Sequence, residues 1–215
     1  MSSSESNPLH DLLGGSRGAL DSALPSVVFI TAFLASSRDL GISLGAALVT
    51  AVGLAGLRLW RHERPVRVLG GVAAVAIAAV VAARTGSASD YFLPSLLANT
   101  ASALIWAVSI LAGWPMLGLV IGFLLGQRTS WRRDPDLLRA YSRASWIWAA
   151  SFLLRAGINL PLYLSDNLVG LGVARVLLGW PLVLGIIAGS WWLIQRSLPP
   201  GHPGIRHPRT ENVPG

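Results

Sequence analysis

The stretch that decides the fold runs from Gly41 to Ala83 and reads GISLGAALVTAVGLAGLRLW, RHER, PVRVLGGVAAVAIAAVVAA. Its first part, Gly41–Trp60, has the length of about 20 mostly apolar residues that a helix needs to cross a bilayer. The four polar residues after it form a turn. Pro65 fits the first turn of a second helix, where a missing N–H costs nothing. The stretch therefore predicts two transmembrane helices joined by a tight polar turn.

The composition of the whole chain supports a membrane protein. Of its 215 residues, 53% are hydrophobic and only 13% are charged, whereas about a quarter of the residues in a soluble domain are charged. The formal net charge is +7, and every basic residue is an arginine. Because these arginines lie in short clusters between apolar runs, they indicate membrane topology, and we expect no nucleic-acid partner.

Four further apolar segments extend the pattern to about six spans. The first is the weakest, because its clean apolar part is short and it reaches spanning length only if it starts near Ala19. The prediction is an all-α fold, a polytopic bundle of transmembrane helices. The four segments are Leu24–Ala35, Leu93–Ala112, Ala144–Leu164 and Leu168–Ile194.

The polar segments divide the chain into three parts. Residues 1–18 form a polar tail that lacks the basic start and apolar stretch of a signal peptide. Residues 19–194 form the six-span domain, and residues 195–215, rich in proline and glycine, are expected to be a disordered tail. Within the domain, residues 114–143 are expected to be interfacial or cytoplasmic. Trp114–Gly126 is too short to cross, which leaves an interfacial helix, a re-entrant helix or an extension of the fourth span.

The arginines also predict an orientation. With the N-terminus inside, thirteen arginines lie on the cytoplasmic side and two, Arg38 and Arg84, lie outside. Cytoplasmic loops carry the excess of basic residues. We therefore expect a multi-pass protein of the bacterial inner membrane with both termini in the cytoplasm, and with anionic lipid headgroups as partners of the cytoplasmic arginines.

A faint internal repeat is also present. LPSVVFITA, from Leu24, resembles LPSLLANTA, from Leu93, and these stretches open the first and fourth spans. The two spans run in opposite directions, as an inverted three-plus-three repeat requires. The favoured alternative is coincidence, because a Leu-Pro pair is common at helix starts.

Residues able to do chemistry are missing from the predicted spans. All carboxylates lie in loops, in tails or at span ends, all four histidines lie in tails or the polar turn, and the chain has no cysteine. A metal site or a buried general base needs such groups at membrane depth. We therefore expect no cofactor, no metal, no catalytic residue and no enzymatic activity.

Two arginines, Arg155 and Arg175, do lie inside the predicted spans. Each is ten residues from Ser165 in the last hairpin, which puts both about 12–15 Å below the outer surface. A central arginine costs about 2.5–3.5 kcal/mol, so something must offset the charge. The favoured interpretation is structural, with contacts to outer carboxylates such as Asp90, Asp166 and Asp39, or to Asn99 and Asn159. The alternative is an anion site for a lipid phosphate or an anionic solute.

The segment SWRRDPDLLRAYSRASW, Ser130–Trp146, has a plainer interpretation. Its arginines are expected to lie at an anionic leaflet, each worth about 1 kcal/mol. Leu137, Leu138 and Tyr141 are expected to dip into that leaflet. Asp134 is predicted to cap a helix that begins with Pro135.

Several stretches resemble an actinobacterial membrane family classed as domain of unknown function 3159. They are AARTGSASDYFLPSLLAN (Ala82–Asn99), LRAGINLPLYL (Leu154–Leu164) and LGVARVLLGWPLV (Leu171–Val183). The resemblance covers about Gly14–Ile194 and implies an integral membrane protein without an assigned activity. With the polar groups discussed above, it makes the following residues candidates for binding: Arg84, Asp90, Asn99, Arg155, Asn159, Tyr163 and Arg175.

A more distant likeness leads to a second functional hypothesis. LPSVVFITAF (from Leu24) and WIWAASFLLRAGINL (from Trp146) are similar to the intracellular septation protein A family, which is associated with envelope synthesis and division. The sequence favours a small transporter or a lipid- or anion-handling protein. The alternative is a non-catalytic envelope or division scaffold with membrane-protein partners or a homo-oligomeric state.

Overall fold

The computed structural model describes residues 15–63, 65–127, 129–205 and 208–209. Over these residues the chain is helical, with no strand, as the sequence predicts. It divides into two compact units. Unit 1 contains the described residues up to Ser95 together with Ile158–Trp180. Unit 2 contains Leu96–Gly157 and the described residues from Pro181 onward.

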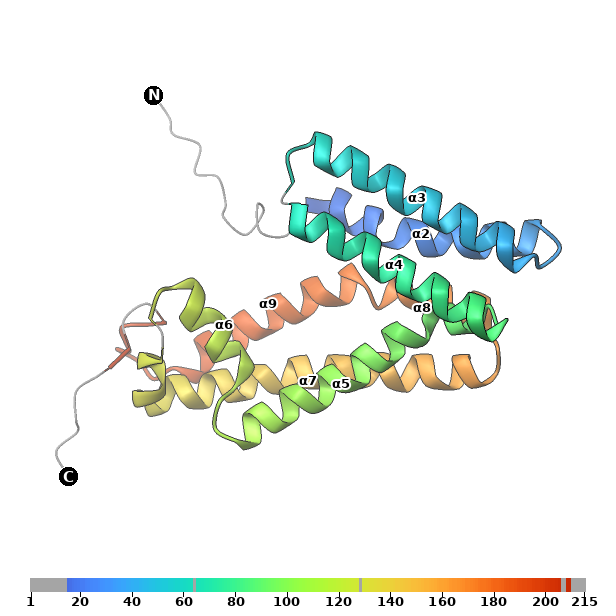
Figure 1. Ribbon diagram of the computed structural model, residues 1–215. Coiled ribbons are helices and arrows are strands. Elements are labelled where there is room, and N and C mark those ends of the chain that lie inside the picture. The colour runs from blue at the N-terminus through green and yellow to red at the C-terminus, as the bar shows by residue number, and fades with distance from the viewer. Residues whose placement is uncertain (1–14, 64, 128, 206–207, 210–215) are drawn as a thin grey trace. The chain divides into compact units, whose positions relative to one another are not determined.

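Unit 1 is built from three long helices and several shorter pieces. Helix α2 packs along α3, α3 along α4, and α2 also contacts α8 (Figure 1). The predicted helix start at Pro65 is confirmed, and the structure adds a cap at Asp39. Pro65 opens α4, and the Asp39 carboxylate caps α3 by accepting a hydrogen bond from Ile42 N at 2.9 Å. The elements are α2 (Gly15–Ala35), α3 (Leu40–Trp60), α4 (Pro65–Thr85), η1 (Ser89–Phe92) and α8 (Leu168–Leu177), with the end of α7.

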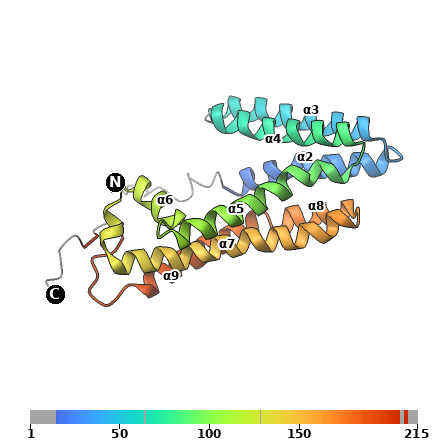
Figure 2. The same ribbon diagram turned by 60° about the horizontal axis from the view of Figure 1, so that its bottom comes forward.

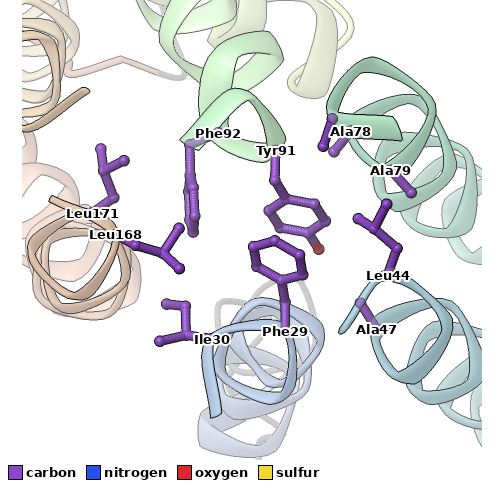
Figure 3. Packing of buried hydrophobic residues seen from close by; sticks show 11 residues of the cluster. Phe29, Ile30, Leu44, Ala47, Ala78, Ala79, Tyr91, Phe92, Leu168 and Leu171 are labelled. Carbon is purple, nitrogen blue, oxygen red and sulfur yellow. The ribbon is translucent and has the colours of Figure 1, made fainter. Parts of the chain in front are cut away.

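The core of unit 1 centres on aromatic rings from two separate elements. Phe29 of α2 stacks on Tyr91 of η1 with ring centroids 4.2 Å apart, and Phe92 meets Tyr91 edge to face (Figure 3). Small side chains on α3 and α4, including Ala47 and Ala79, complete the cluster. Small residues let helices approach closely, and that is the main source of packing energy in a lipid environment.

Unit 2 is organised around one tryptophan. The side chain of Trp131, on η2, is fully buried and meets Tyr141 edge to face at 5.6 Å. Helices α7 and α9 (Figure 2) are joined by a hydrogen bond that Trp148 Nε1 donates to Ser190 Oγ at 3.1 Å. The elements are most of α5 (Leu93–Leu111), α6 (Met116–Leu124), η2 (Ser130–Arg133), most of α7 (Pro135–Leu164), and α9 (Trp180–Ser197).

Among the described residues, five helical stretches are long and apolar enough to cross a membrane, so the protein is a multi-pass helical membrane protein. The first predicted span corresponds to α2, in which only the shorter stretch Ala23–Ala35 is strongly apolar, so that span stays a prediction. The five stretches are Leu40–Trp60, Val68–Thr85, Ser89–Leu111, Pro135–Leu164 and Leu168–Ser197.

The structure excludes one of the three alternatives for Trp114–Gly126, the segment after the fourth span. Helix α5 ends at Leu111, and Gly113 has a positive φ of 71°. Such a left-handed residue after a helix is a common C-terminal stop. The chain then forms α6, a separate helix of nine residues, Met116–Leu124. It is therefore no extension of the fourth span, and the interfacial and re-entrant alternatives both stay open.

The last predicted span, Leu168–Ile194, is interrupted. The structure has two helices, α8 and α9, separated by Leu178 and Gly179. The cause lies in the sequence, because Pro181 has no N–H to donate and disfavours helical geometry in the residue before it. The boundary between the two units, after Trp180, falls at this interruption.

The arginine-rich segment differs from the prediction in its apolar residues. Leu137 and Tyr141 were expected to dip into the leaflet, but both are fully buried in the protein against Trp131. Helix α7 begins at Pro135, so the part of the segment from Pro135 onward belongs to the long helix, and its Leu137 and Tyr141 pack against Trp131 of η2. The predicted cap is confirmed, since Asp134 Oδ1 accepts hydrogen bonds from the backbone N–H groups of Asp136 and Leu137.

The two predicted tails are only partly described. Residues 1–14, and with them most of the N-terminal tail, lie outside the described residues. The C-terminal tail was predicted to be disordered, but α9 continues to Ser197, and residues beyond it make defined contacts. Gln127 Nε2 donates to the Ile205 carbonyl at 2.8 Å, and Arg209 N donates to Asp134 Oδ2 at 2.9 Å. These partners are distant in sequence, so composition alone gives no sign of them.

Candidate functional site

Two of the predicted site residues meet in unit 1. Asp90 lies in η1 and Tyr163 near the end of α7, and the Tyr163 hydroxyl donates a hydrogen bond to Asp90 Oδ1. The two residues are 73 positions apart in the sequence. A hydrogen bond to a carboxylate is about twice as strong as one between neutral groups. The contact therefore fixes η1 against the end of α7.

Arg175 lies close to the same short helix. It is in the last turn of α8, and its guanidinium is 6.0 Å from the centre of the Phe92 ring. A cation is favoured at a helix C-terminus, where the carbonyl groups point outward. Among the described residues, Arg175 has no carboxylate within ion-pair distance. The structure thus brings Asp90, Tyr163 and Arg175 together around η1, each through a different contact.

The other predicted residues lie elsewhere. Arg155 belongs to unit 2, where its guanidinium is 5.5 Å from the Phe152 ring one turn earlier on α7. Asn99 is in unit 2 and Asn159 in unit 1, and both are half-buried. None of these three is without an interaction partner. Arg84 is exposed in the last turn of α4.

The predicted pairing of Arg155 with Arg175 joins residues of different units. Each arginine has an aromatic ring beside it in its own unit. The anion site that the sequence offers as an alternative for the two arginines stays a prediction.

With the geometry in place, the comparison with known families can be stated. The model of the family described as "Protein of unknown function (DUF3159)" matches residues 13–201, which include nearly all of the helical region. The chain belongs to this family. No curated protein and no solved structure matches it. Membership of DUF3159 therefore agrees with the resemblance seen in the sequence and assigns no activity.

The sequence did not predict a second polar cluster, which lies in unit 2. His202 Nδ1 accepts a hydrogen bond from Gly204 N at 3.0 Å, so the ring proton of the neutral imidazole is on Nε2. Nε2 lies 2.9 Å from Asp134 Oδ2, and both side chains are 1% exposed. Arg209 N donates to the same oxygen at 2.9 Å. The sequence pointed to only one member of this cluster. Asp134 was predicted as a helix cap, but its distant partners, His202 and Arg209, were not predicted.

The surroundings change the ionisation of Asp134. Burial of its carboxylate opposes ionisation. The backbone N–H groups of Arg209 and Leu137, together with His202, outweigh that effect and hold the pKa of Asp134 below its usual value. The carboxylate is therefore ionised at neutral pH. It ties the C-terminal segment to the start of α7.

The same cluster has the spacing of a metal site. The ligand atoms of Asp134, Asp136 and His202 lie within 4.8 Å of one another. However, both oxygens of Asp134 already accept hydrogen bonds from within the chain. Arg209 Nη1 is also 3.9 Å from Asp136 Oδ2, which places a positive charge where a cation would bind. We therefore assign the cluster to holding the C-terminal segment.

Proposed function

We propose that this DUF3159 protein is a small, non-catalytic membrane protein that binds the anionic group of a lipid phosphate or a small anionic solute inside the bilayer. The observation that carries the proposal is Arg175, a guanidinium within a membrane-spanning stretch that has no carboxylate partner among the described residues. Phosphate and carboxylate are the groups that the planar guanidinium binds best. Such a protein moves its ligand through the bilayer without making or breaking bonds.

The energies support a ligand at Arg175. A central arginine costs about 2.5–3.5 kcal/mol. A cation–π contact is worth about 0.5–1 kcal/mol, and the distance of 6.0 Å to Phe92 is at its outer limit. The helix C-terminus adds about 0.3–1 kcal/mol. These contacts offset part of the cost, and a charge-assisted hydrogen bond to an anion supplies the rest.

The proposed absence of catalysis is supported by the contacts that the polar groups near Arg175 already make with one another. Asp90, one of the outer carboxylates that the sequence offered as a partner for Arg175, accepts the hydrogen bond of Tyr163. A general base or nucleophile needs a partner that activates it. The chain has no cysteine, and its histidines lie outside the spanning stretches.

The proposed setting is the bacterial inner membrane with both termini in the cytoplasm. The support is the distribution of arginines, thirteen on one side against two on the other. One of the thirteen, Arg132, lies 3.7 Å above the ring of Trp114. Tryptophan is enriched at the membrane interface, so this pair fits a position near anionic headgroups.

The test uses the full chain in proteoliposomes. Release of a trapped anion (inorganic phosphate or sulfate) and movement of a labelled phosphatidylglycerol between leaflets are measured for the wild type, Arg175→Gln and Arg175→Lys. We expect one of the two activities to fall at least tenfold in Arg175→Gln and to be partly retained in Arg175→Lys, because lysine keeps the charge but loses the bidentate geometry. The activity that falls identifies the ligand as solute or lipid.

His62→Gln is the matched control, because it changes an exposed polar side chain of a loop in unit 1. It should leave both activities unchanged. If Arg175→Gln retains full activity, or the wild type shows no activity, the proposal fails. Co-purification of one fixed membrane-protein partner with no activity would then favour the alternative, an envelope or division scaffold.

A further inference from the structure

One end of unit 1 contains a hollow of about 390 Å³. It is formed where three connections meet, those between α2 and α3, between α4 and η1, and between α7 and α8 (Figure 1). Its volume is within the range of small-molecule sites. All of its lining residues belong to unit 1.

Two residues of opposite charge, Arg38 and Asp166, line this hollow. Both side chains are exposed. Among the described residues neither takes part in an ion pair. The hollow therefore offers one cationic and one anionic group to an incoming molecule.

The backbone at both positions is unfavourable for these residues. Arg38 has a φ of 69° and Asp166 a φ of 50°, each just after the end of a helix. Left-handed geometry at a helix end is normally given to glycine, because other side chains destabilise it. The chain follows that rule after α4, α5 and α6, with Gly86, Gly113 and Gly126. Arg38 and Asp166 do not follow it, and neither does His62 after α3, which does not line the hollow. The backbone angle alone therefore assigns no role, and the two charges stand out because both line one hollow.

Hydrogen bonds fix the backbone at both positions. Arg38 N donates to the Phe33 carbonyl at 2.9 Å, and Asp166 N donates to the Tyr163 carbonyl at 3.1 Å. Asn167 also lines the hollow, and its side-chain oxygen caps α8 by accepting from Gly170 N at 2.8 Å. The charged side chains therefore project from backbone that is already fixed, so little ordering is needed on binding.

The rest of the lining is mixed, with Ser87 and Ser89 on one part and apolar side chains on another. Phe33, Leu34 and Val169 form the apolar part, and Leu34 and Val169 are 56% and 50% exposed. The hollow lies where spanning helices end, which is the depth of lipid headgroups. A ligand that fits has an anionic group, a cationic group and an apolar chain.

We propose that this hollow binds the headgroup of a phospholipid that carries a phosphate and a primary amine. The phosphate lies at Arg38, where guanidinium favours a bidentate contact. The ammonium group lies at Asp166, and an acyl chain follows Leu34 and Val169. The site is separate from Arg175 and does not depend on the function proposed above.

The test measures lipid binding to the full chain in detergent by native mass spectrometry. Phosphatidylethanolamine, phosphatidylglycerol, phosphatidylcholine and free phosphoethanolamine are the probes. We expect the wild type to retain phosphatidylethanolamine about tenfold better than the other two lipids, which lack a primary ammonium. Free phosphoethanolamine should bind weakly, because it lacks the acyl chain. Equal binding of the three lipids, or tight binding of the free headgroup, overturns the proposal.

Glycine substitutions separate binding from folding. Arg38→Gly and Asp166→Gly relieve the left-handed backbone, so each should raise the melting temperature by about 2–4 °C. Arg38→Gly should nevertheless lose binding of phosphatidylethanolamine about tenfold, and Asp166→Gly should lose the preference over phosphatidylglycerol. If both variants bind as the wild type does, the site does not exist as proposed.

His62→Gly is the matched control, because His62 follows α3 with a φ of 58° and does not line the hollow. It should gain the same thermal stability and keep wild-type lipid binding. Arg38→Gln keeps the side-chain volume and should lose binding as Arg38→Gly does. Loss of binding in His62→Gly, or full binding in Arg38→Gln, contradicts the assignment.

Discussion

Unit 1 and unit 2 are both helical, but the contacts that stabilise the interior of each unit differ. The core of unit 1 is an aromatic stack between Phe29 and Tyr91, surrounded by alanines of α3 and α4. Unit 2 encloses the rings of Trp131 and Tyr141 and adds polar contacts between distant segments, such as His202 with Asp134. Apolar burial gives little driving force where lipid is the solvent, so close packing and polar contacts must supply stability. Unit 1 relies mainly on close packing, and unit 2 adds polar contacts between distant segments to its packed core.

A pair of reporters allows the units to be compared directly. The chain has no cysteine, and Ala51 in unit 1 and Ala149 in unit 2 are both 5% exposed. In the single variants Ala51→Cys and Ala149→Cys, the rate of maleimide labelling on heating reports the opening of one unit. The predictions below use these reporters and proceed from the largest effect to the smallest.

Asp134→Ala should destabilise unit 2 by about 3 kcal/mol. The change removes the cap of α7, worth about 1 kcal/mol, and leaves the His202 donor buried without an acceptor, at about 1–3 kcal/mol. The cysteine at position 149 should therefore become reactive at a lower temperature, with little change at position 51. Equal shifts at both positions would show that the units do not open separately.

Gly118→Ala should cost unit 2 about 1–2 kcal/mol. An added Cβ at this position lies 2.8 Å from two atoms of the Trp131 ring, which is rigid and fully buried. Overpacking of this kind costs about 1–3 kcal/mol, and the better helix propensity of alanine returns part of it. Adding Trp131→Leu makes room for the Cβ. In that background Gly118→Ala should show a smaller cost, and an unchanged cost would contradict the contact.

Tyr163→Phe should cost unit 1 about 1.5 kcal/mol, because it removes the hydrogen bond that Asp90 accepts. The labelling temperature at position 51 should fall and that at position 149 should not. Asp90→Asn is the companion variant, since its neutral oxygen still accepts from the hydroxyl. It should lose less than Tyr163→Phe, and the reverse order would argue against the contact.

Gly172→Ala should change the stability of unit 1 by less than about 0.5 kcal/mol. The added Cβ lies 2.0 Å from Ile30 Cδ1, but this atom is the far end of a flexible side chain and can rotate away. The gain in helix propensity offsets the strain. A loss as large as that of Gly118→Ala would show that α2 and α8 cannot adjust. In that case Ile30→Val should rescue the variant.

The smallest effect is the acid sensitivity of unit 2. Because the folded-state pKa of Asp134 lies below its usual value, its contribution to stability is complete above about pH 4 and is lost as the pH falls through the lowered pKa. The cysteine at position 149 should therefore open at a lower temperature only in that acidic range. Asp134→Asn should remove this dependence, and a dependence that persists in it must come from another group.

The sequence predicted those parts of the fold that depend on local signals. Gly41–Trp60 and the helix that begins with Pro65 follow from apolar runs and proline chemistry, and Asp134 was recognised as a cap. Contacts between distant segments were missed. Nothing local distinguishes His202 from a histidine in a free tail. The residues around Tyr141 do not show that it packs under Trp131, because a helix face that packs on protein and one that faces lipid have the same apolar pattern.

In the candidate site, too, local signals were predicted and contacts between distant residues were not. Asp90 and Tyr163 were both singled out, but their contact with each other was not predicted, since it depends on how η1 packs against the end of α7. Arg175 was noted because a charge in an apolar run stands out in any sequence. Arg38 was taken as a topology signal and Asp166 as a partner for the intramembrane arginines, because nothing local shows that both line one hollow.

The interruption between α8 and α9 has a mechanical consequence. A continuous helix transmits a push along its axis as a stiff rod, because each turn is hydrogen-bonded to the next. At Leu178 and Gly179 that rod is absent, and Pro181 removes one further donor just beyond. A load along the axis of α9 therefore does not reach α8 through a continuous hydrogen-bonded rod, and Gly179 lies at the break. Bending at such a break costs fewer helical hydrogen bonds than bending inside either helix.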